Sequence, residues 1–406
     1  MDVTPIPEGL AVDATEYSSG IEFAPDFEQL DARVFCVQRV AHEVQRIDGA
    51  PQVGDVIVAI NGQTLVEFDR IVGPYLLYST LYGRAWALAR ALGSQPAWWP
   101  TALNRGETTY RLRNPERGEY EIRQPGLKAD DVSWPSLPSR TFPGFTVSLS
   151  LPSFDLYRSA PGRNIVAFDW KGFTKDNLVD DLAQLVAYSS GNELLDHDVI
   201  VDFTRSRGGS DGVLALQVLV GQPFKTTFGD LRISDVIDPF IASREASPRL
   251  RDWLLNDVRA AQARGDAYTA PVPFKLRHLP VESDGILQPA PQHFTGRLVA
   301  IFGSQMGSQV DQVASILIDN GACHSIGMPT GGYSNSWEWE ENVTFPTTGQ
   351  PVAEFIWSMG RTYRPNGEEL EGNPPVPDDV VLLTTENVAD YYDRLLQRAV
   401  EYLTSE

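Results

Sequence analysis

Short apolar runs alternate with amphipathic segments through the second half of the chain. The runs at 199–203 and 298–302 are short and almost wholly apolar, as buried strands are. Each is followed by a glycine-containing turn and then by a segment whose apolar residues recur every three or four positions. Strands that alternate with helices predict an α/β body. We therefore expect the two runs to be strands of one sheet, with helices that start near Gly212 and Ser308.

The first half of the chain has a different pattern, because its apolar residues alternate with polar ones. Residues 56–60 are a strand candidate, and the Asn-Gly pair that follows them is a strong two-residue hairpin turn. A second hairpin is predicted over 108–125, after a stretch around 70–105 that is helical in pattern. A proline-containing loop at 128–143 indicates a linker to the α/β body.

These patterns predict three parts. They are an N-terminal extension over 1–30, a β-rich module with a helical insertion over 31–130, and an α/β core over 131–406. Within the core, residues 221–294 are expected to form a polar, charged insertion with one clear helix around 248–264. A β-hairpin is expected over 340–363, and a closing helix over 390–403.

Composition narrows the class of protein. The chain has 406 residues, of which 42% are hydrophobic, and a formal net charge of −21. It is therefore expected to be globular, and its acidic surface argues against nucleic acid or anionic membrane as a partner. We find no apolar stretch long enough to span a membrane and no signal-peptide pattern. A cytoplasmic protein is expected, or a secreted or periplasmic one if a leader segment is missing, and a homo-oligomer is possible.

Cysteine and histidine usage indicates neither a disulfide framework nor a metal site. The two cysteines, Cys36 and Cys323, both lie in apolar runs and are expected to be buried thiols. The five histidines have no metal-ligand spacing. We therefore expect no metal and no cofactor.

Ser308 is the first candidate nucleophile. It lies at the start of the predicted helix, directly after the strand at 298–302 and its turn. Backbone N–H groups are unpaired at a helix start, and the helix dipole favours negative charge there. A nucleophile that generates an oxyanion beside itself is well served by that position. The alternative is structural, because Ser308 and Asp311 form an S-x-x-D pair of the kind that caps helices.

Ser210 is a second candidate. It lies within GGSDG at 208–212, which fits the G-x-S-x-G nucleophile elbow of α/β-hydrolases in the required strand-to-helix context. An esterase of that kind would need a later histidine, for which His278, His293 and His324 are available. Alternatively, the adjacent glycines Gly208 and Gly209 aim backbone N–H groups at an anion and serve a nucleophile elsewhere.

Five ordered motifs resemble the carboxyl-terminal processing (tail-specific) serine peptidases. They are a PDZ-like hairpin around 53–62, VIVDFTRSRGG at 199–209, SQVDQVASILIDNG at 308–321, IGMPTGG at 326–332 and EGNPPVPD at 371–378. The resemblance covers roughly residues 31–400. It implies an α/β fold with a crotonase-like core of ββα units and a PDZ-like module on its N-terminal side. It also implies Ser308 as the nucleophile and an oxyanion hole formed by Gly208, with Gly209 beside it, and the amide of Gln309.

The sequence departs from this family in its general base. The Ser–Lys branch has its lysine where this chain has Tyr333, and no lysine follows Lys275, so a Ser–Lys dyad is excluded. The tricorn-like and chlamydial-protease-like branch uses serine, histidine and glutamate. Its glutamate corresponds to Glu371, or less well to Glu369, and its histidine lies before the PDZ-like module.

Upstream of Val53 the only histidine is His42, in a strand-like segment that belongs to the module itself. Either His42 or another histidine is the base, or an N-terminal segment is missing, or the protein is no longer a peptidase. The resemblance implies a serine-peptidase-like hydrolase that acts on peptides or proteins by acyl transfer through Ser308. The first alternative is an altered member that binds a peptide or small molecule, or performs other chemistry, in the same cleft. The second is an esterase that uses Ser210.

Overall fold

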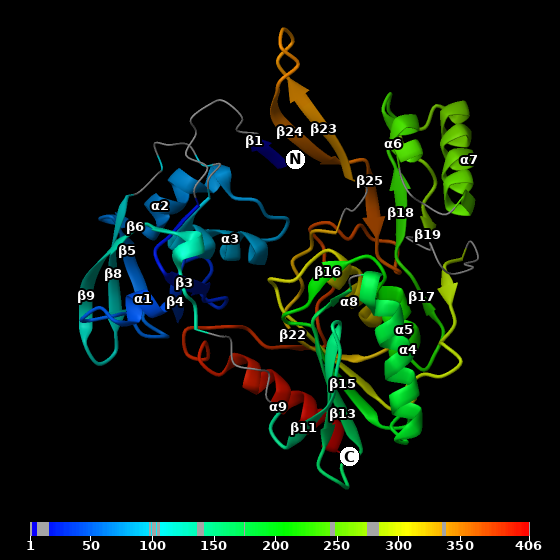
Figure 1. The fold of residues 1–406 in the computed structure, drawn as a ribbon, viewed down its shortest axis with the longest axis horizontal. Coiled ribbons are helices and arrows are strands. Elements are labelled where there is room, and N and C mark those ends of the chain that lie inside the picture. The colour runs from blue at the N-terminus through cyan, green and yellow to red at the C-terminus, as the bar shows by residue number, and fades with distance from the viewer. Residues whose placement is uncertain are drawn as a thin grey trace.

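The chain forms two lobes (Figure 1), and one of its hydrophobic cores contains residues of both lobes. The computed structural model describes residues 2–5, 16–96, 99, 103, 106–135, 142–173, 175–243, 248–273, 284–334 and 338–405. The N-terminal lobe holds the blue and cyan elements other than β1 (Asp2–Pro5), and the C-terminal lobe holds the elements from β11 (Phe145–Ser150) onward. The red helix α9 (Tyr391–Thr404) lies beside the sheet of the C-terminal lobe. None of the described helices is long and apolar enough to cross a membrane.

A seven-stranded sheet is the centre of the C-terminal lobe. In sheet order its strands are β11 (Phe145–Ser150), β12 (Phe154–Ser159), β13 (Ile165–Trp170), β15 (Asp198–Asp202), β21 (Leu298–Phe302), β22 (His324–Gly327) and β26 (Asp379–Val380). The first two pairings are antiparallel and the rest are parallel. Val199 pairs with Leu298, which confirms that the two apolar runs lie in one sheet.

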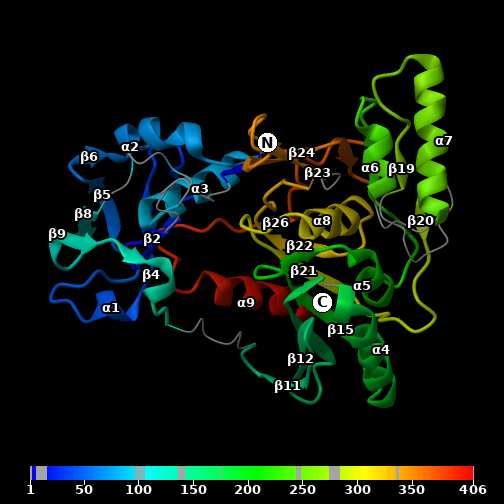
Figure 2. The ribbon, with the colours of Figure 1, turned by 45° about the horizontal axis from the view of Figure 1, so that its top comes forward.

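Alternate residues of the central strands face two different cores, which explains why these strands are apolar on both faces. One core contains Val199 and Ala300, together with residues from α4 (Lys175–Gly191), α5 (Gly212–Leu219) and α8 (Gln309–Asp319). The other core contains Ile200, together with residues from α9 and from the N-terminal lobe. The sheet is therefore covered by three helices on one face and by α9 and the other lobe on the other (Figure 2).

The N-terminal lobe is built on a second sheet of six strands. They are β3 (Ile21–Pro25), β4 (Phe35–Val40), β5 (Val56–Ile60), β6 (Gln63–Thr64), β8 (Glu107–Asn114) and β9 (Gly118–Pro125). Both predicted hairpins are present, and the turn residues Asn61 and Gly62 have φ of 50° and 75°, as a tight two-residue turn requires. The strand β3 corrects the expected extension over 1–30, because its apolar residues are part of this sheet.

Helices and short elements complete this lobe. They are α1 (His42–Gln45), α2 (Leu65–Val72), η1 (Gly73–Tyr75), α3 (Leu81–Gly93), β2 (Tyr17–Ser18), β7 (Ser94–Gln95), β10 (Leu127–Lys128) and η3 (Ala129–Asp131). The helix α3 reaches the other lobe, where the indole N–H of Trp86 donates to Ser304 Oγ at 2.9 Å. Because Ser304 lies in the turn after β21, this bond fixes the N-terminal lobe next to the loop that precedes Ser308.

The insertion at 221–294 has more structure than the single helix expected. Besides α7 (Pro248–Arg264) it contains α6 (Ile237–Ser243), β17 (Phe224–Lys225), β18 (Phe228–Leu231), β19 (Val272–Pro273) and β20 (Ile286–Leu287). The strand β18 pairs with β25 (Gly360–Tyr363), so the hairpin expected over 340–363 contains only β23 (Glu338–Thr344) and β24 (Pro351–Ser358). The N-terminal strand β1 (Asp2–Pro5) pairs with β24.

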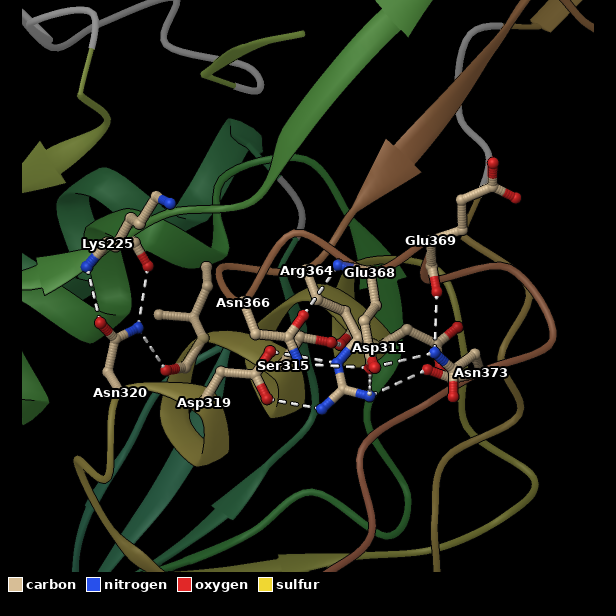
Figure 3. A network of polar contacts seen from close by, with 11 residues as sticks. Lys225, Asp311, Ser315, Asp319, Asn320, Arg364, Asn366, Glu368, Glu369 and Asn373 are labelled. Carbon is tan, nitrogen blue, oxygen red and sulfur yellow. Dashed lines mark hydrogen bonds and ion pairs between the residues drawn. The ribbon is translucent and has the colours of Figure 1, made fainter.

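A polar network fixes the segment after β25 onto the end of α8 (Figure 3). The guanidinium of Arg364 donates to both carboxylate oxygens of Asp319, at 2.5 and 3.0 Å. It also donates to Glu368 at 3.3 Å and to the carbonyl of Asn373 at 3.4 Å. The side chains of Arg364 and Asp319 are only 10% and 5% exposed. The pair therefore holds the loop that carries Glu371 against the helix that begins after Ser308.

The substitution Arg364→Leu tests this anchor. It leaves the Asp319 carboxylate buried without its partner, so we expect a loss of about 3–5 kcal/mol in the free energy of unfolding. Urea unfolding measures that loss. The control is Arg394→Ala, whose pair with Asp390 is exposed at 52% and 51%, and there we expect a change below about 1 kcal/mol. Equal losses in the two variants would contradict the anchor.

Candidate functional site

Ser308 has a strained backbone. Its φ of 58° and ψ of −121° lie in a region that residues with a Cβ rarely adopt. It is the residue before α8, its N–H donates to the Tyr333 carbonyl at 3.0 Å, and its side chain makes no helix-capping hydrogen bond. The S-x-x-D capping hypothesis is therefore wrong. Strain of this kind is concentrated at functional sites, where the surrounding structure holds it in place.

Asp311, the other half of the supposed capping pair, supports the turn that faces Ser308. Its carboxylate is fully buried and accepts the N–H groups of Gly332 and Tyr333, both at 2.9 Å. Burial raises the pKa of Asp311 to about 7, although the hydrogen bonds from the N–H groups of Gly332 and Tyr333 act in the other direction. Its negative neighbour Glu371 raises that pKa further.

Gly208 lies directly against Ser308. It belongs to β16 (Arg207–Gly209), which pairs with β14 (Gly172–Phe173). A Cβ on Gly208 would lie 3.1 Å from both the Cβ and the Oγ of Ser308, and 3.9 Å from the amide nitrogen of Gln309. Gln309 itself is buried. The tertiary structure thus brings Gly208 against Ser308 and Gln309, which lie about a hundred positions further along the chain.

Gly209 is required for a different reason from Gly208. A Cβ on Gly209 would lie 2.1 Å from the carbonyl oxygen of Phe173, and its φ is 154°. The amide of the next residue, Ser210, donates to that same carbonyl at 3.2 Å. The close pairing of β16 with β14 therefore accounts for Gly209, and the approach to Ser308 accounts for Gly208.

Glu371 contacts the immediate neighbours of Ser308. One carboxylate oxygen accepts the N–H of Ser334 at 2.9 Å, and Ser334 Oγ donates to the carbonyl of Ser308 at 3.2 Å. The other carboxylate oxygen accepts the hydroxyl of Ser79, from the N-terminal lobe. Glu369, by contrast, is exposed and pairs with Arg361 at 3.1 Å. Of the two glutamates considered, the structure places Glu371 beside the candidate nucleophile.

The structure does not bring His42 to Ser308. His42 begins the short helix α1, where a strand was expected, and its exposed ring contacts the side chain of Gln45 at 3.4 Å. Both views place α1 in the N-terminal lobe, well away from α8 (Figures 1 and 2).

The other described histidines lie on the opposite edge of the sheet from Ser308. His197 and His293 precede β15 and β21, and His324 begins β22, so all three are at the amino ends of parallel strands. Ser308 and Ser210 follow the carboxyl ends. His278 lies outside the described residues. Among the described part of the chain, the structure therefore brings no imidazole to either serine.

Ser210 lacks the geometry of a nucleophile elbow. Its hydroxyl donates to the carboxylate of the next residue, Asp211, at 3.0 Å. It is not among the described non-glycine residues with positive φ, whereas Ser308 is. The strained strand-to-helix turn that exposes a nucleophile is thus found at Ser308.

Tyr333 occupies the sequence position of the lysine of the Ser–Lys branch. Its ring fills the space beside two glycines, because a Cβ on Gly307 or Gly331 would lie 2.2 Å from a ring carbon. Its hydroxyl donates to the carbonyl of Gln305 at 2.9 Å. Burial raises the pKa of Tyr333, so this phenol stays protonated near neutral pH and is a poor base.

A cavity of about 750 Å³ lies between the lobes, next to the loop before Ser308. The C-terminal lobe contributes Thr204, Arg205, Gln305 and Met306 to its lining, and the N-terminal lobe contributes chiefly β3 and α3 residues such as Phe23 and Trp86. Ligands of α/β proteins commonly bind at this edge, outside the carboxyl ends of parallel strands. No group of three potential metal-binding side chains lies together among the described residues.

Comparison with solved structures finds the same fold in mature CPAF. A crystal structure of mature CPAF matches with a TM-score of 0.67 at 15% identity, over 98% of this chain and 84% of that chain. Mature CPAF complexed with lactacystin matches with 0.65 at 15% identity, over 96% and 83%. The photosystem II D1 C-terminal processing protease matches with only 0.41 at 13% identity, over 96% and 78%.

No protein-family model matches the sequence, and no curated protein matches it. The similarity to CPAF therefore shows the fold, a mixed α/β architecture, and does so at the level of structure only. Solved structures named as a C-terminal processing protease and a putative S41 protease match less well, and this chain has the fold of mature CPAF.

The pH dependence of stability tests the burial of Asp311. Because its pKa rises to about 7 on folding, its contribution to stability is fully present below about pH 4 and is lost as the pH rises towards 7. We expect the free energy of unfolding of the native protein, minus that of Asp311→Asn, to fall by up to about 1.4 kcal/mol per pH unit in this window. Urea unfolding at a series of pH values measures the difference, and a flat difference would contradict it.

Proposed function

We propose that this chain is a serine-peptidase-like hydrolase that acts on peptides or proteins by acyl transfer through Ser308. The observation that carries the proposal is the strained backbone of Ser308, with Gly208 packed against its Oγ. A serine that only caps a helix needs neither feature. The fold that this chain shares with mature CPAF supports the same reading.

The chemistry follows from the surroundings of Ser308. Its Oγ attacks a peptide carbonyl, so that an O–C bond forms, the Oγ proton passes to a base and the carbonyl oxygen becomes negative; the described residues do not identify that base. The backbone amides of Gly208 and Gln309 are the proposed donors to that oxygen, and the N-terminus of α8 adds a favourable dipole. Loss of the amine leaves an acyl group on Ser308, which water then removes.

At a finer level we propose that the core is crotonase-like and carries a PDZ-like module on its N-terminal side. Support comes from the predicted hairpin with its Asn61 turn, the six-stranded sheet around it, and the helices α2 and α3 that pack on that sheet. The module then begins near residue 16 and ends near residue 135, and the core follows.

A second candidate function is binding of a peptide with little turnover. The observation in its favour is that Glu371, the proposed third member of the catalytic set, contacts Ser79. A serine nucleophile without a positioned base loses about 10²–10⁴-fold in rate. The esterase that would use Ser210 has no comparable support, because that hydroxyl is bonded to Asp211.

Covalent labelling distinguishes the two serines. A fluorophosphonate probe should modify Ser308, because its Oγ lies beside the proposed oxyanion donors, and labelling should be lost in Ser308→Ala. The site of modification is read by mass spectrometry of tryptic peptides. Ser210→Ala is the control and should label as the native protein does. Lactacystin, bound in one mature CPAF structure, is a second probe. Labelling that is lost in Ser210→Ala would instead favour the esterase hypothesis.

The adjacent glycines provide a matched pair for the oxyanion hole. Gly208→Ala keeps the backbone N–H, but the new Cβ would lie 3.1 Å from Ser308 Oγ and push this N–H and the Oγ out of alignment. We therefore expect labelling to slow by about 10²–10³-fold, as loss of one oxyanion donor does, with little change in stability. In Gly209→Ala the Cβ would lie 2.1 Å from the Phe173 carbonyl, so we expect lower thermal stability. Labelling rates and melting temperatures separate the two. An unchanged labelling rate in Gly208→Ala would remove the main support for this oxyanion hole.

A further inference from the structure

The carboxylate of Glu371 lies where it could accept a hydrogen bond from a general base, and the side chain that donates to it there is that of Ser79. In a serine–histidine–carboxylate arrangement the carboxylate orients the base, which in turn reaches the nucleophile. Here one oxygen of Glu371 accepts the N–H of Ser334, a neighbour of Ser308, and the other accepts the hydroxyl of Ser79. We propose that Ser79 occupies the place of the general base in this site. The inference rests on the proposed function of Ser308.

Several contacts place Ser79 at the site independently of its hydroxyl. A Cβ on Gly372 would lie 3.1 Å from the carbonyl of Ser79, and the N–H of Gly372 donates to Gly332 at 2.8 Å. The hydroxyl of the next residue, Thr80, donates to the carbonyl of Gly331 at 3.2 Å. Ser79 and Thr80 thus pack on the glycine turn whose following residue, Tyr333, accepts the N–H of Ser308.

The segment around Ser79 is fixed rather than loosely apposed. Thr80 is the N-cap of α3 and accepts the N–H of Gly83 at 2.9 Å. One turn further on, Trp86 of the same helix donates to Ser304 in the other lobe. Ser79 is half-buried, and the preceding residues Leu77 and Tyr78 are 56% and 48% exposed. The backbone at Ser79 is therefore anchored, and the residue itself is partly exposed.

The chemical consequence is that no described residue is placed to accept the proton of Ser308 Oγ. A serine hydroxyl cannot take the proton of Ser308 Oγ at neutral pH, so native acylation is expected to be slow. An imidazole at position 79 would supply the missing proton acceptor. The Oγ proton passes to one ring nitrogen as the O–C bond forms, and the imidazolium returns that proton to the leaving amine when the C–N bond breaks. Glu371 accepts the hydrogen bond of the other ring N–H.

The substitution Ser79→His tests the proposal on the full chain. We expect fluorophosphonate labelling of Ser308 to accelerate by about 10²–10⁴-fold over the native protein. The rate should rise with pH around the usual imidazole pKa of about 6.5. The matched control is Tyr78→His, which adds the same group one residue away at an exposed position and should label at the native rate. Adding Glu371→Gln to Ser79→His should remove most of the gain.

A second measurement does not require the histidine variant to fold. In Ser79→Ala the place beside Glu371 is empty, so free imidazole in the buffer should accelerate labelling more than it does for the native protein. Either result supports the proposal.

Two outcomes would overturn it. One is a folded Ser79→His protein that labels at Ser308 no faster than the native protein, which leaves the proposed function intact. The other is a loss of labelling in Ser79→Ala as complete as in Ser308→Ala, which would make the Ser79 hydroxyl itself a proton relay. Absence of Ser308 labelling in every variant is a different failure, because it removes the proposed function as well.

Discussion

The site depends on one buried carboxylate, that of Asp311. It accepts two successive backbone N–H groups, from Gly332 and Tyr333, and so fixes the turn after β22. The carbonyl of Tyr333 in turn accepts the N–H of Ser308. A positive φ at a serine costs about 1–3 kcal/mol and persists only where neighbouring bonds over-determine it. The bonds from Asp311 supply that constraint, and this explains why an acidic group is kept in a position where burial raises its pKa.

The candidate site is assembled from five separate chain segments. The strand β16 contributes Gly208, the start of α8 contributes Ser308, and the turn at 331–334 lies beneath them. The segment after β25 contributes Glu371, which the buried pair of Arg364 and Asp319 ties to the end of α8. The fifth segment comes from the other lobe, at Ser79. The site is therefore complete only when the N-terminal lobe packs on the C-terminal lobe. Substitutions at Trp86 or Thr80, which contact the C-terminal lobe, are expected to change the geometry of the site.

The two lobes are joined by burial as well as by these polar contacts. One hydrophobic core contains residues of the N-terminal sheet, of α3, of the central strands and of α9. Such a continuous core makes independent motion of the lobes costly, because separating them would expose apolar surface at about 25 cal/mol per Å². The packing of the whole interface therefore stabilises the contact of Ser79 with Glu371, in addition to the loop that carries Ser79.

Local residue patterns in the sequence determined the helices and strands of this protein, whereas contacts between distant residues decided the arrangement of its candidate site. Apolar runs and helical spacing predicted β15, β21 and α8, and an Asn-Gly pair predicted the first hairpin, because each of these signals acts within a few residues. The pairing of β25 with β18 and the different reasons for Gly208 and Gly209 depend on partners distant in sequence. So does the contact of Ser79 with Glu371, which are 292 positions apart. No local pattern marks Ser79, because its role comes from the carboxylate that folding brings to it.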